Sequence, residues 1–343
     1  MLMISYRGKS RLKKFGIGLL ITLAVLLAIW LCWLIWLQRY LVYTKDGVYF
    51  DFSRSSKTLS GEIVPWEAAE QPTVAIEYVD GESGGESGEP AVTRFVGYSI
   101  TTDMLLSDFA GVRKSVEALP AGTVVLLDVK SVYGNFYYST SLTGASTSDS
   151  IDPAAMDELI SYLRTSGMYL VARLPAFRDN AFALEHTACG LALSSGALWT
   201  DESHCYWLDP GNETVMANLA QICRELTERG FDEVAFTDFY FPDSGSIVYN
   251  STMSKSDSIK SAAKRLVDTF TTDAFKVSFC ADSLDFPLPS SAGHLFLSGV
   301  DPEQAGTLAK TAESAFGEGK LVFLTDSRDT RLEAASVIRG LDS

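Results

Sequence analysis

Between residues 92 and 343, short apolar runs alternate with segments of helical periodicity, and this alternation constrains the fold more than any other feature. Repeated strand–helix units favour a parallel sheet, and about 250 residues of them is the usual size of a (β/α) barrel. We therefore predict an α/β fold with a TIM-like barrel in this part of the chain.

The predicted strands cover residues 94–100, 123–129, 168–174, 233–239, 275–280, 294–297 and 321–324. The predicted helices cover residues 103–119, 153–165, 213–229, 257–270, 302–316 and 328–341. These seven strands leave the barrel incomplete, one strand short of the usual eight. A doubly wound open sheet is the alternative, but no glycine-rich phosphate turn follows the first strand, so nothing supports a nucleotide site.

The predicted strand at 233–239 carries polar residues at its far end. In a parallel barrel the loops at the carboxyl ends of the strands form the site. Thr237, Asp238 and Tyr240 are therefore candidate functional residues, although Asp238 can equally bond a neighbouring loop. Glu233 begins the strand, so we expect it to support stability at the opposite end of the barrel.

Residues 15–37 contain no charged side chain. Twenty-three residues of helix, at about 1.5 Å each, can cross a hydrocarbon layer of about 30 Å. Five basic and no acidic residues precede this run, so we expect residues 1–14 to be cytoplasmic, with the rest of the chain beyond the cell membrane. A cleaved signal peptide is the alternative, but the run is longer than a usual signal core.

Two further segments separate this predicted anchor from the barrel domain, residues 92–343. Residues 38–66 contain an alternating pattern around Asp46-Gly47 that predicts a short hairpin. Residues 67–91 contain seven acids and no basic residue, which predicts a disordered, flexible linker.

The charge of the chain bears on its partners. The net charge is −15, and the first fourteen residues contribute +5, which leaves −20 for the remainder. Such a surface repels phosphate backbones, so nucleic acid is not an expected partner. A neutral or cationic polymer is more compatible.

The cysteines and histidines indicate no metal site or cofactor. The histidines are widely scattered, and no CxxC pair occurs. Cys189 and Cys205 flank one loop and can form a disulfide in an oxidising compartment. Free thiols at Cys189, Cys205, Cys223 and Cys280 are the preferred interpretation.

Four ordered motifs carry a family resemblance: residues 124–130 (VVLLDVK), 169–179 (YLVARLPAFRD), 207–210 (WLDP) and 230–242 (GFDEVAFTDFYFP). Together they resemble the bacterial "putative glycoside hydrolase" family with a TIM-barrel fold, over roughly residues 94–343. The resemblance implies a carbohydrate site at the strand ends, built from Asp128, Lys130, Arg173, Asp179 and the last motif. The chain departs from the family pattern, with Thr237 where the family has an Asp, Asp238 at its Tyr position and Tyr240 at its Arg position.

A glycosidase generally needs two carboxyl groups that flank the scissile bond. The candidate catalytic residues are Asp128, Asp238 and Asp282. The candidate substrate-binding residues are Lys130, Arg173, Phe177, Asp179, Trp207, Thr237 and Tyr240. The alternative for Lys130 and Arg173 is that they neutralise nearby carboxylates, Arg173 with Asp128 or Asp238.

Two functions follow. The first is a membrane-anchored, extracytoplasmic, glycoside-hydrolase-like barrel that acts on or binds envelope or extracellular polysaccharide. The second is a catalytically inactive barrel that serves as a glycan- or cell-wall-binding scaffold. Besides a polysaccharide or oligosaccharide, the expected partner is the lipid bilayer, through residues 15–37.

Overall fold

The computed structural model describes residues 41–44, 47–50 and 94–341, which fall into the units Met1–Gly85 and Glu86–Ser343. In the first unit, β1 (Leu41–Thr44) and β2 (Gly47–Phe50) pair antiparallel, with Thr44 opposite Gly47. The predicted anchor at 15–37 and the predicted linker at 67–91 lie outside the described residues. Within the described ranges, no helix is both long and apolar enough to span a membrane.

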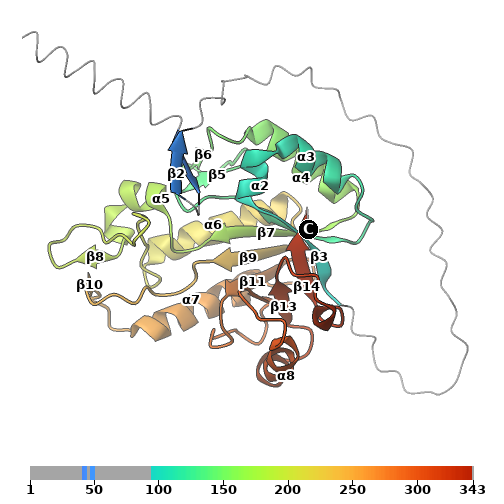
Figure 1. Cartoon of the computed structure of the whole chain (residues 1–343). Helices are drawn as coiled ribbons and strands as arrows, with labels where there is room; N and C mark the ends of the chain where they lie inside the picture. Colours follow the sequence, from blue (N-terminus) through green and yellow to red (C-terminus); the bar gives the residue numbers. More distant parts are fainter. Residues whose placement is uncertain (1–40, 45–46, 51–93, 342–343) are drawn as a thin grey trace, which may run out of the picture. The chain divides into compact units, whose positions relative to one another are not determined.

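In the second unit, eight parallel strands form a closed barrel in the order β11-β12-β13-β14-β3-β4-β7-β9 (Figure 1). The barrel is therefore complete, and the open-sheet alternative is wrong. Its strands are β3 (Val96–Ile100), β4 (Val124–Asp128), β7 (Tyr169–Pro175), β9 (Glu233–Thr237), β11 (Lys276–Ala281), β12 (Leu295–Leu297), β13 (Leu321–Leu324) and β14 (Val337–Gly340).

The eighth strand, β14, lies within the segment 328–341 that the sequence pattern assigned to a helix, so that assignment is wrong. Only a short 3-10 turn, η3 (Thr330–Leu332), precedes it. Alanine and glutamate give residues 333–336 a helical composition, but Val337 and Ile338 are β-branched and fully buried. The strand lies between β13 and β3 and provides the backbone partners that both would otherwise lack.

The helices that surround the barrel are α2 (Thr102–Ser107), α3 (Phe109–Val116), α4 (Pro153–Thr165), α5 (Asn180–Glu185), α6 (Glu213–Glu228), α7 (Lys255–Phe270) and α8 (Ala305–Phe316). The predicted helix at 103–119 is divided at Asp108. Its carboxylate accepts the backbone N–H of Gly111 at 2.8 Å and so begins a new helix, α3. Asp152 caps the start of α4, since its carboxylate accepts the N–H of Ala154 at 2.9 Å.

Several short elements lie in the loops that follow the strands. They are β5 (Asn135–Phe136), β6 (Ser146–Thr147), the 3-10 turn η2 (Thr187–Cys189), β8 (Ala192–Leu193) and β10 (Ile247–Val248). β8 follows β7 in the chain and β10 follows β9, and the two pair antiparallel. The long loops after neighbouring strands are therefore joined to each other.

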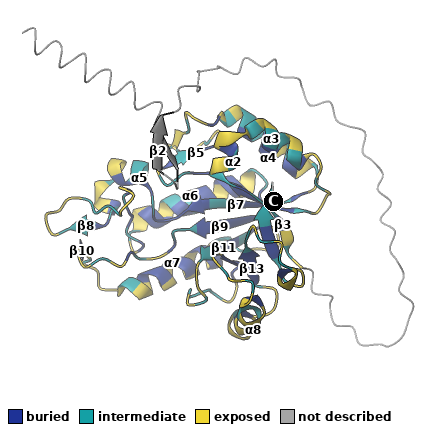
Figure 2. Ribbon diagram, viewed as in Figure 1, coloured by how far each residue is buried: buried dark blue, intermediate teal, exposed yellow. Residues whose placement is uncertain are grey.

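Alternation along each strand divides the core into two layers. Val124 and Leu126 of β4 point into the barrel, where Val171, Phe296 and other side chains fill the interior. Val125, Leu127 and their counterparts on the other strands pack outward against the helices. Figure 2 shows buried residues along most of the barrel strands and along parts of the helices.

A polar cluster occupies the amino-terminal end of the barrel. Glu233 is fully buried and accepts hydrogen bonds from Tyr169 Oη at 3.0 Å and from the Ser278 hydroxyl. His294 Nδ1 lies 2.9 Å from the same carboxylate. Four strands or strand ends are thus joined through one side chain, which supports the stabilising role expected of Glu233.

Gly97 is expected to be required for closure, because β3 and β4 approach closely there. A Cβ at Gly97 would lie 1.9 Å from the carbonyl oxygen of Val124. We expect Gly97→Ala to lower the free energy of unfolding by about 3 kcal/mol or more, through overpacking that the backbone cannot relieve. Urea denaturation measures the change.

Gly306 in α8 is the matched control, since a Cβ there meets no atom within 4 Å. Gly306→Ala should raise the free energy of unfolding by about 0.5–1 kcal/mol, because alanine restricts the unfolded chain and favours the helix. Equal effects of the two substitutions would contradict the steric argument at Gly97.

Candidate functional site

A cavity of about 600 Å³ opens at the carboxyl ends of the barrel strands. It brings together five of the predicted site residues, namely Asp128, Lys130, Arg173, Thr237 and Asp238. Its other walls come from residues 102, 106, 131–133, 135, 137, 148, 150, 174 and 175. Side chains from β4, β7 and β9 therefore converge on one site, although they are far apart in the sequence.

The alternation of the strands explains why these side chains meet. Asp128 continues the inward series of Val124 and Leu126 on β4. Arg173 continues the inward series of β7 and is the direct register partner of Asp128. Both side chains therefore stand on the uppermost inward layer of the barrel, where the core ends and the cavity begins.

Both oxygens of the Asp128 carboxylate are engaged. Oδ1 accepts from Arg173 Nε at 2.5 Å, and Oδ2 accepts from the backbone N–H and the hydroxyl of Thr102 at 2.7 and 3.0 Å. Burial alone would lower the pKa of Arg173, but the ion pair with Asp128 raises it above its ordinary value. The pairing of Arg173 with Asp128, rather than with Asp238, is the neutralising arrangement that the sequence left open.

Asp238 has a different environment. Its φ of +51° is in the left-handed region, which few non-glycine residues adopt, and its side chain is mostly buried. The Thr237 hydroxyl donates to its carboxylate at 3.0 Å, and Arg178 Nη1 is 4.0 Å away. Burial raises the pKa of Asp238 above its usual value, although Thr237 and Arg178 oppose this effect.

Lys130 is buried and pairs with Asp179 at 2.6 Å. The Asp179 carboxylate also accepts the N–H of Phe182 at 2.9 Å and so caps α5. Asp179 therefore holds Lys130 from beneath the cavity rather than forming part of its lining.

Two charged residues of this region had no predicted role. Arg178 lies in the motif at residues 169–179, and Asp201 lies in the long loop after β7. Arg178 Nε lies 2.7 Å from Asp201 Oδ2 without an aligned hydrogen bond, so the contact is an ion pair. No spacing in the sequence relates residues 178 and 201, because only the fold of the loop brings them together.

Four other candidates lie outside the cavity lining. Asp282 is exposed in the loop after β11. Phe177 is fully buried and packs against Phe239 with ring centroids 4.6 Å apart, so its ring cannot serve as a platform for a sugar. Trp207 is also buried. Its ring packs against that of Tyr240, with centroids 4.8 Å apart, and Tyr240 is 53% exposed.

The cavity also contains wall residues that the sequence did not single out. Thr102 begins α2, two residues after the end of the first barrel strand, and Tyr137 Oη is 3.1 Å from its hydroxyl. Tyr133 and Leu106 line the cavity and are 55% and 40% exposed. The position of Thr102 just after a strand could have predicted a site residue, whereas Tyr133 lies in a loop without periodicity.

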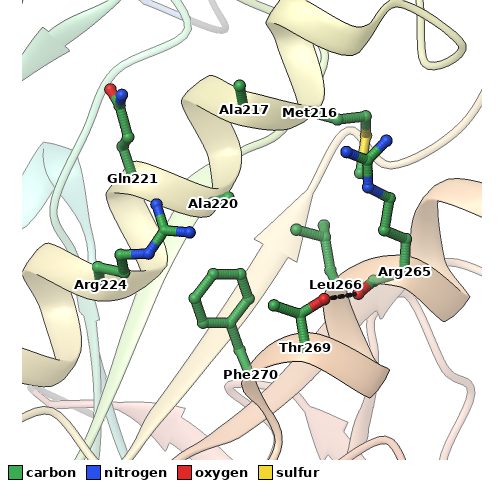
Figure 3. A pocket seen from close by; sticks show the side chains of 9 residues that line it. All are labelled: Met216, Ala217, Ala220, Gln221, Arg224, Arg265, Leu266, Thr269 and Phe270. Carbon is green, nitrogen blue, oxygen red and sulfur yellow. Dashed lines mark hydrogen bonds between the residues drawn. The ribbon is translucent and has the colours of Figure 1, made fainter.

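The other parts of the described chain hold no metal site and no disulfide, and they include a smaller cavity. No group of three His, Cys, Asp or Glu residues within it could hold a metal ion. Cys189, Cys205, Cys223 and Cys280 are free thiols, as preferred, so the alternative disulfide is not formed. A second cavity of about 250 Å³ lies between α6 and α7 and is lined by Arg224, Arg265 and mostly apolar side chains (Figure 3). It contains no carboxyl group.

The arrangement at the strand-end cavity can provide acid–base chemistry. One carboxylate, Asp128, accepts hydrogen bonds from the guanidinium of Arg173 and from two donors of Thr102. The other, Asp238, is mostly buried with its nearest cation, Arg178, 4.0 Å away, and burial raises its pKa above the usual value. Pairs of carboxyl groups in such unequal environments are the pattern of an acid and a base.

Residues 114–277 match a family model described as a "Putative glycosyl hydrolase domain", which confirms the resemblance found in the sequence. The match extends from α3 into β11 and includes the strands that carry Asp128, Arg173 and Asp238. No curated protein sequence matches the chain.

Solved structures support the fold. A GH36 alpha-galactosidase from Geobacillus stearothermophilus in complex with stachyose has a TM-score of 0.54 and 9% identity, over 74% of this chain and 39% of the enzyme. Alpha-L-fucosidase isoenzyme 2 from Paenibacillus thiaminolyticus has a TM-score of 0.50 and 10% identity, over 73% and 45%. The chain thus spans less than half the length of either enzyme, and at these identities the likeness concerns the fold.

The raised pKa of Asp238 has a measurable effect on stability. The folded state keeps the proton at pH values where the unfolded chain, in which the aspartate has its ordinary pKa of 3.8, has released it. Stability is therefore lost as pH rises from about 3.8 through the folded pKa. Asp238→Asn should remove this loss, so its advantage in Tm over the wild type should grow across that range, measured by thermal unfolding at successive pH values.

Asp329→Asn is the opposite control. A hydrogen bond from Arg331 lowers the pKa of Asp329 to about 2, so the contribution of Asp329 to stability is present above pH 3.8 and lost as pH falls towards 2.

In Asp238→Asn, asparagine can also relax the left-handed backbone at position 238, but that gain in stability is the same at every pH. A difference between Asp238→Asn and the wild type that does not vary with pH would contradict the assignment.

Proposed function

Because residues 114–277 carry a glycosyl-hydrolase-like domain, we propose that the barrel binds a carbohydrate in the strand-end cavity and hydrolyses a glycosidic bond there. Asp238 is the general acid that protonates the leaving oxygen. Asp128 is the second carboxyl group, which stabilises the developing positive charge or activates the attacking group.

The observation that carries this proposal is the unequal pair of carboxyl groups on one cavity. A general acid must hold its proton near neutral pH, which requires burial or the absence of a close cation. Asp238 is mostly buried, which raises its pKa, and its nearest cation, Arg178, is 4.0 Å away. Asp128 instead accepts hydrogen bonds from Arg173 and Thr102.

The charges of the site favour a neutral or basic sugar. Lys130 and Arg173 line the cavity, and each is already paired with a carboxylate. A uronate or phosphate would have to displace one of these partners. Tyr133 and Leu106 add exposed apolar surface at the wall, which suits the faces of pyranose rings.

Replacement of Asp238 separates chemistry from binding. In Asp238→Asn, turnover of the polysaccharide that the wild type cleaves should fall by at least about 100-fold, because the proton donor is lost. Retention on that polysaccharide in an affinity gel should remain. The assays use the full chain and a panel of neutral and amino-sugar polysaccharides.

Asp157→Asn provides the matched control, because Asp157 on α4 pairs with Arg229 at 2.8 Å and does not line the cavity. It should keep both activities. Wild-type protein that neither cleaves nor retains any polysaccharide of the panel would refute the carbohydrate function.

A glycan-binding scaffold without catalysis is the second candidate, and one observation favours it. Both oxygens of Asp128 are occupied by protein donors, which weakens it as a nucleophile or base. In that case the wild type retains polysaccharide without cleaving it, and Asp238→Asn leaves retention unchanged. This outcome would replace hydrolysis by binding as the function of the cavity.

We also propose that the barrel is tethered to the outer face of the cell membrane, where it meets envelope or extracellular polysaccharide. The support is the charge-free run at residues 15–37 and the basic residues before it. The acidic composition of residues 67–91 suits a spacer between tether and barrel.

The tether predicts how the full chain fractionates. It should remain in the membrane fraction after an alkaline carbonate wash, and protease added to intact spheroplasts should digest its barrel. Deletion of residues 15–37 should release the protein into the soluble fraction. Recovery of the full chain in that fraction, or protection of the barrel from protease, would refute the proposed placement.

A further inference from the structure

Each cation near Asp238 is paired with a different carboxylate. Arg173 pairs with Asp128, Lys130 with Asp179, and Arg178 with Asp201 at 2.7 Å. The only ion pair that Asp238 makes within residues 94–341 is the long one to Arg178, at 4.0 Å. Asp238 is thus the one acid of this group that has no cation of its own.

The Arg178–Asp201 pair differs from the other two because Arg178 lies between two carboxylates. Its Nε contacts Asp201 without an aligned hydrogen bond, while Nη1 faces Asp238 Oδ1. The guanidinium can therefore turn from one acid to the other with a small displacement. A guanidinium in direct contact with an Asp typically lowers its pKa by about 1 to 3.

Asp201 is anchored firmly enough to hold Arg178 in place. Its carboxylate accepts the backbone N–H groups of Ser203 and Cys205, both at 2.9 Å, and the indole N–H of Trp207 at 3.0 Å. Trp207 is buried, and its backbone forms a bridge with that of Arg178. Burial opposes the charge of Asp201, but the donors from Cys205 and Trp207 and the positive charge of Arg178 lower its pKa.

We propose that Arg178 and Asp201 are a positioning pair for Asp238, in which Asp201 holds the guanidinium away so that the Asp238 carboxyl can carry a proton. This inference rests on the proposed function, because it assigns Asp238 the role of a proton donor. The pair acts through Asp238 and does not line the cavity itself.

The other groups that face Asp238 do not replace Arg178. Thr237 donates a hydrogen bond, and Lys130 is a more distant cation that Asp179 neutralises. The remaining groups coupled to Asp238 are Asp201, Tyr240, Cys205 and Cys280. Burial raises the pKa of Tyr240 and of both thiols, so these groups remain neutral near pH 7. Arg178 is therefore the cation that controls the proton on Asp238.

The test measures the titration of Asp238 directly in the full chain, by carbon NMR of protein labelled with [4-¹³C]aspartate. The Asp238 signal is identified by its absence in Asp238→Asn. In Asp201→Asn the midpoint of the Asp238 titration should fall by about 1 or more, because the released guanidinium moves to Asp238 and the nearby negative charge of Asp201 is lost. In Arg178→Gln the midpoint should stay as high as in the wild type or rise.

The double variant Asp201→Asn with Arg178→Gln should restore the high midpoint, because the cation that lowers it is gone. Asp157→Asn, which also loses a charged partner of an arginine, should leave the Asp238 signal unchanged. If Asp201→Asn fails to fold, Arg178→Gln still decides, since a fall in its midpoint would overturn the proposal. An unchanged midpoint in folded Asp201→Asn would also overturn it.

Turnover distinguishes this inference from the proposed function. If the wild type cleaves a polysaccharide, the alkaline limb of its pH–rate profile should move to lower pH in Asp201→Asn, by the same amount as the NMR midpoint. A merely structural role would lower the rate without moving that limb. If no polysaccharide is cleaved, the hydrolytic function fails, while the NMR titration still decides the role of the pair.

Discussion

Closure of the eight-stranded barrel is the constraint on which the rest of the structure depends. A closed parallel barrel has no free edge, and each strand must then send alternate side chains inward and outward. The inward layers change from the polar cluster around Glu233, through the apolar layer of Leu126 and Val171, to the charged rim of Asp128 and Arg173. The chemistry of the molecule is confined to this rim because the apolar layer fills the interior below it.

The charged rim must also satisfy its own electrostatics. Buried charges are tolerated when they are paired, so Arg173, Lys130 and Arg178 each lie against a carboxylate. Those pairings leave Asp238 on a left-handed backbone, with a neutral donor from Thr237 and only a distant cation. The acidity of Asp238 therefore depends on how the neighbouring cations are paired with other carboxylates. It is a property of the whole charged rim rather than of a single contact.

Much of this was accessible from the sequence, and the exceptions have physical causes. Seven of the eight barrel strands were predicted because each is a short run of buried, mostly apolar residues. β14 was assigned to a helix because local composition at residues 333–336 favours one, whereas closure between β13 and β3 requires a strand. Asp282 and Phe177 are candidate site residues because each follows a predicted strand. The loop after β11 leaves Asp282 exposed, however, and the fold buries Phe177 against Phe239.

The sequence by itself determined the class of fold, the ends of the strands where Asp128, Arg173 and Asp238 stand, and the family to which residues 114–277 are similar. These follow from periodicity and motif order, which are local properties of the chain. The tertiary structure alone decided which acid pairs with which base, and that Arg178 and Asp201 belong to the same cluster. Ion pairs depend on distances of a few ångströms between residues far apart in the chain, and only the folded loops set those distances.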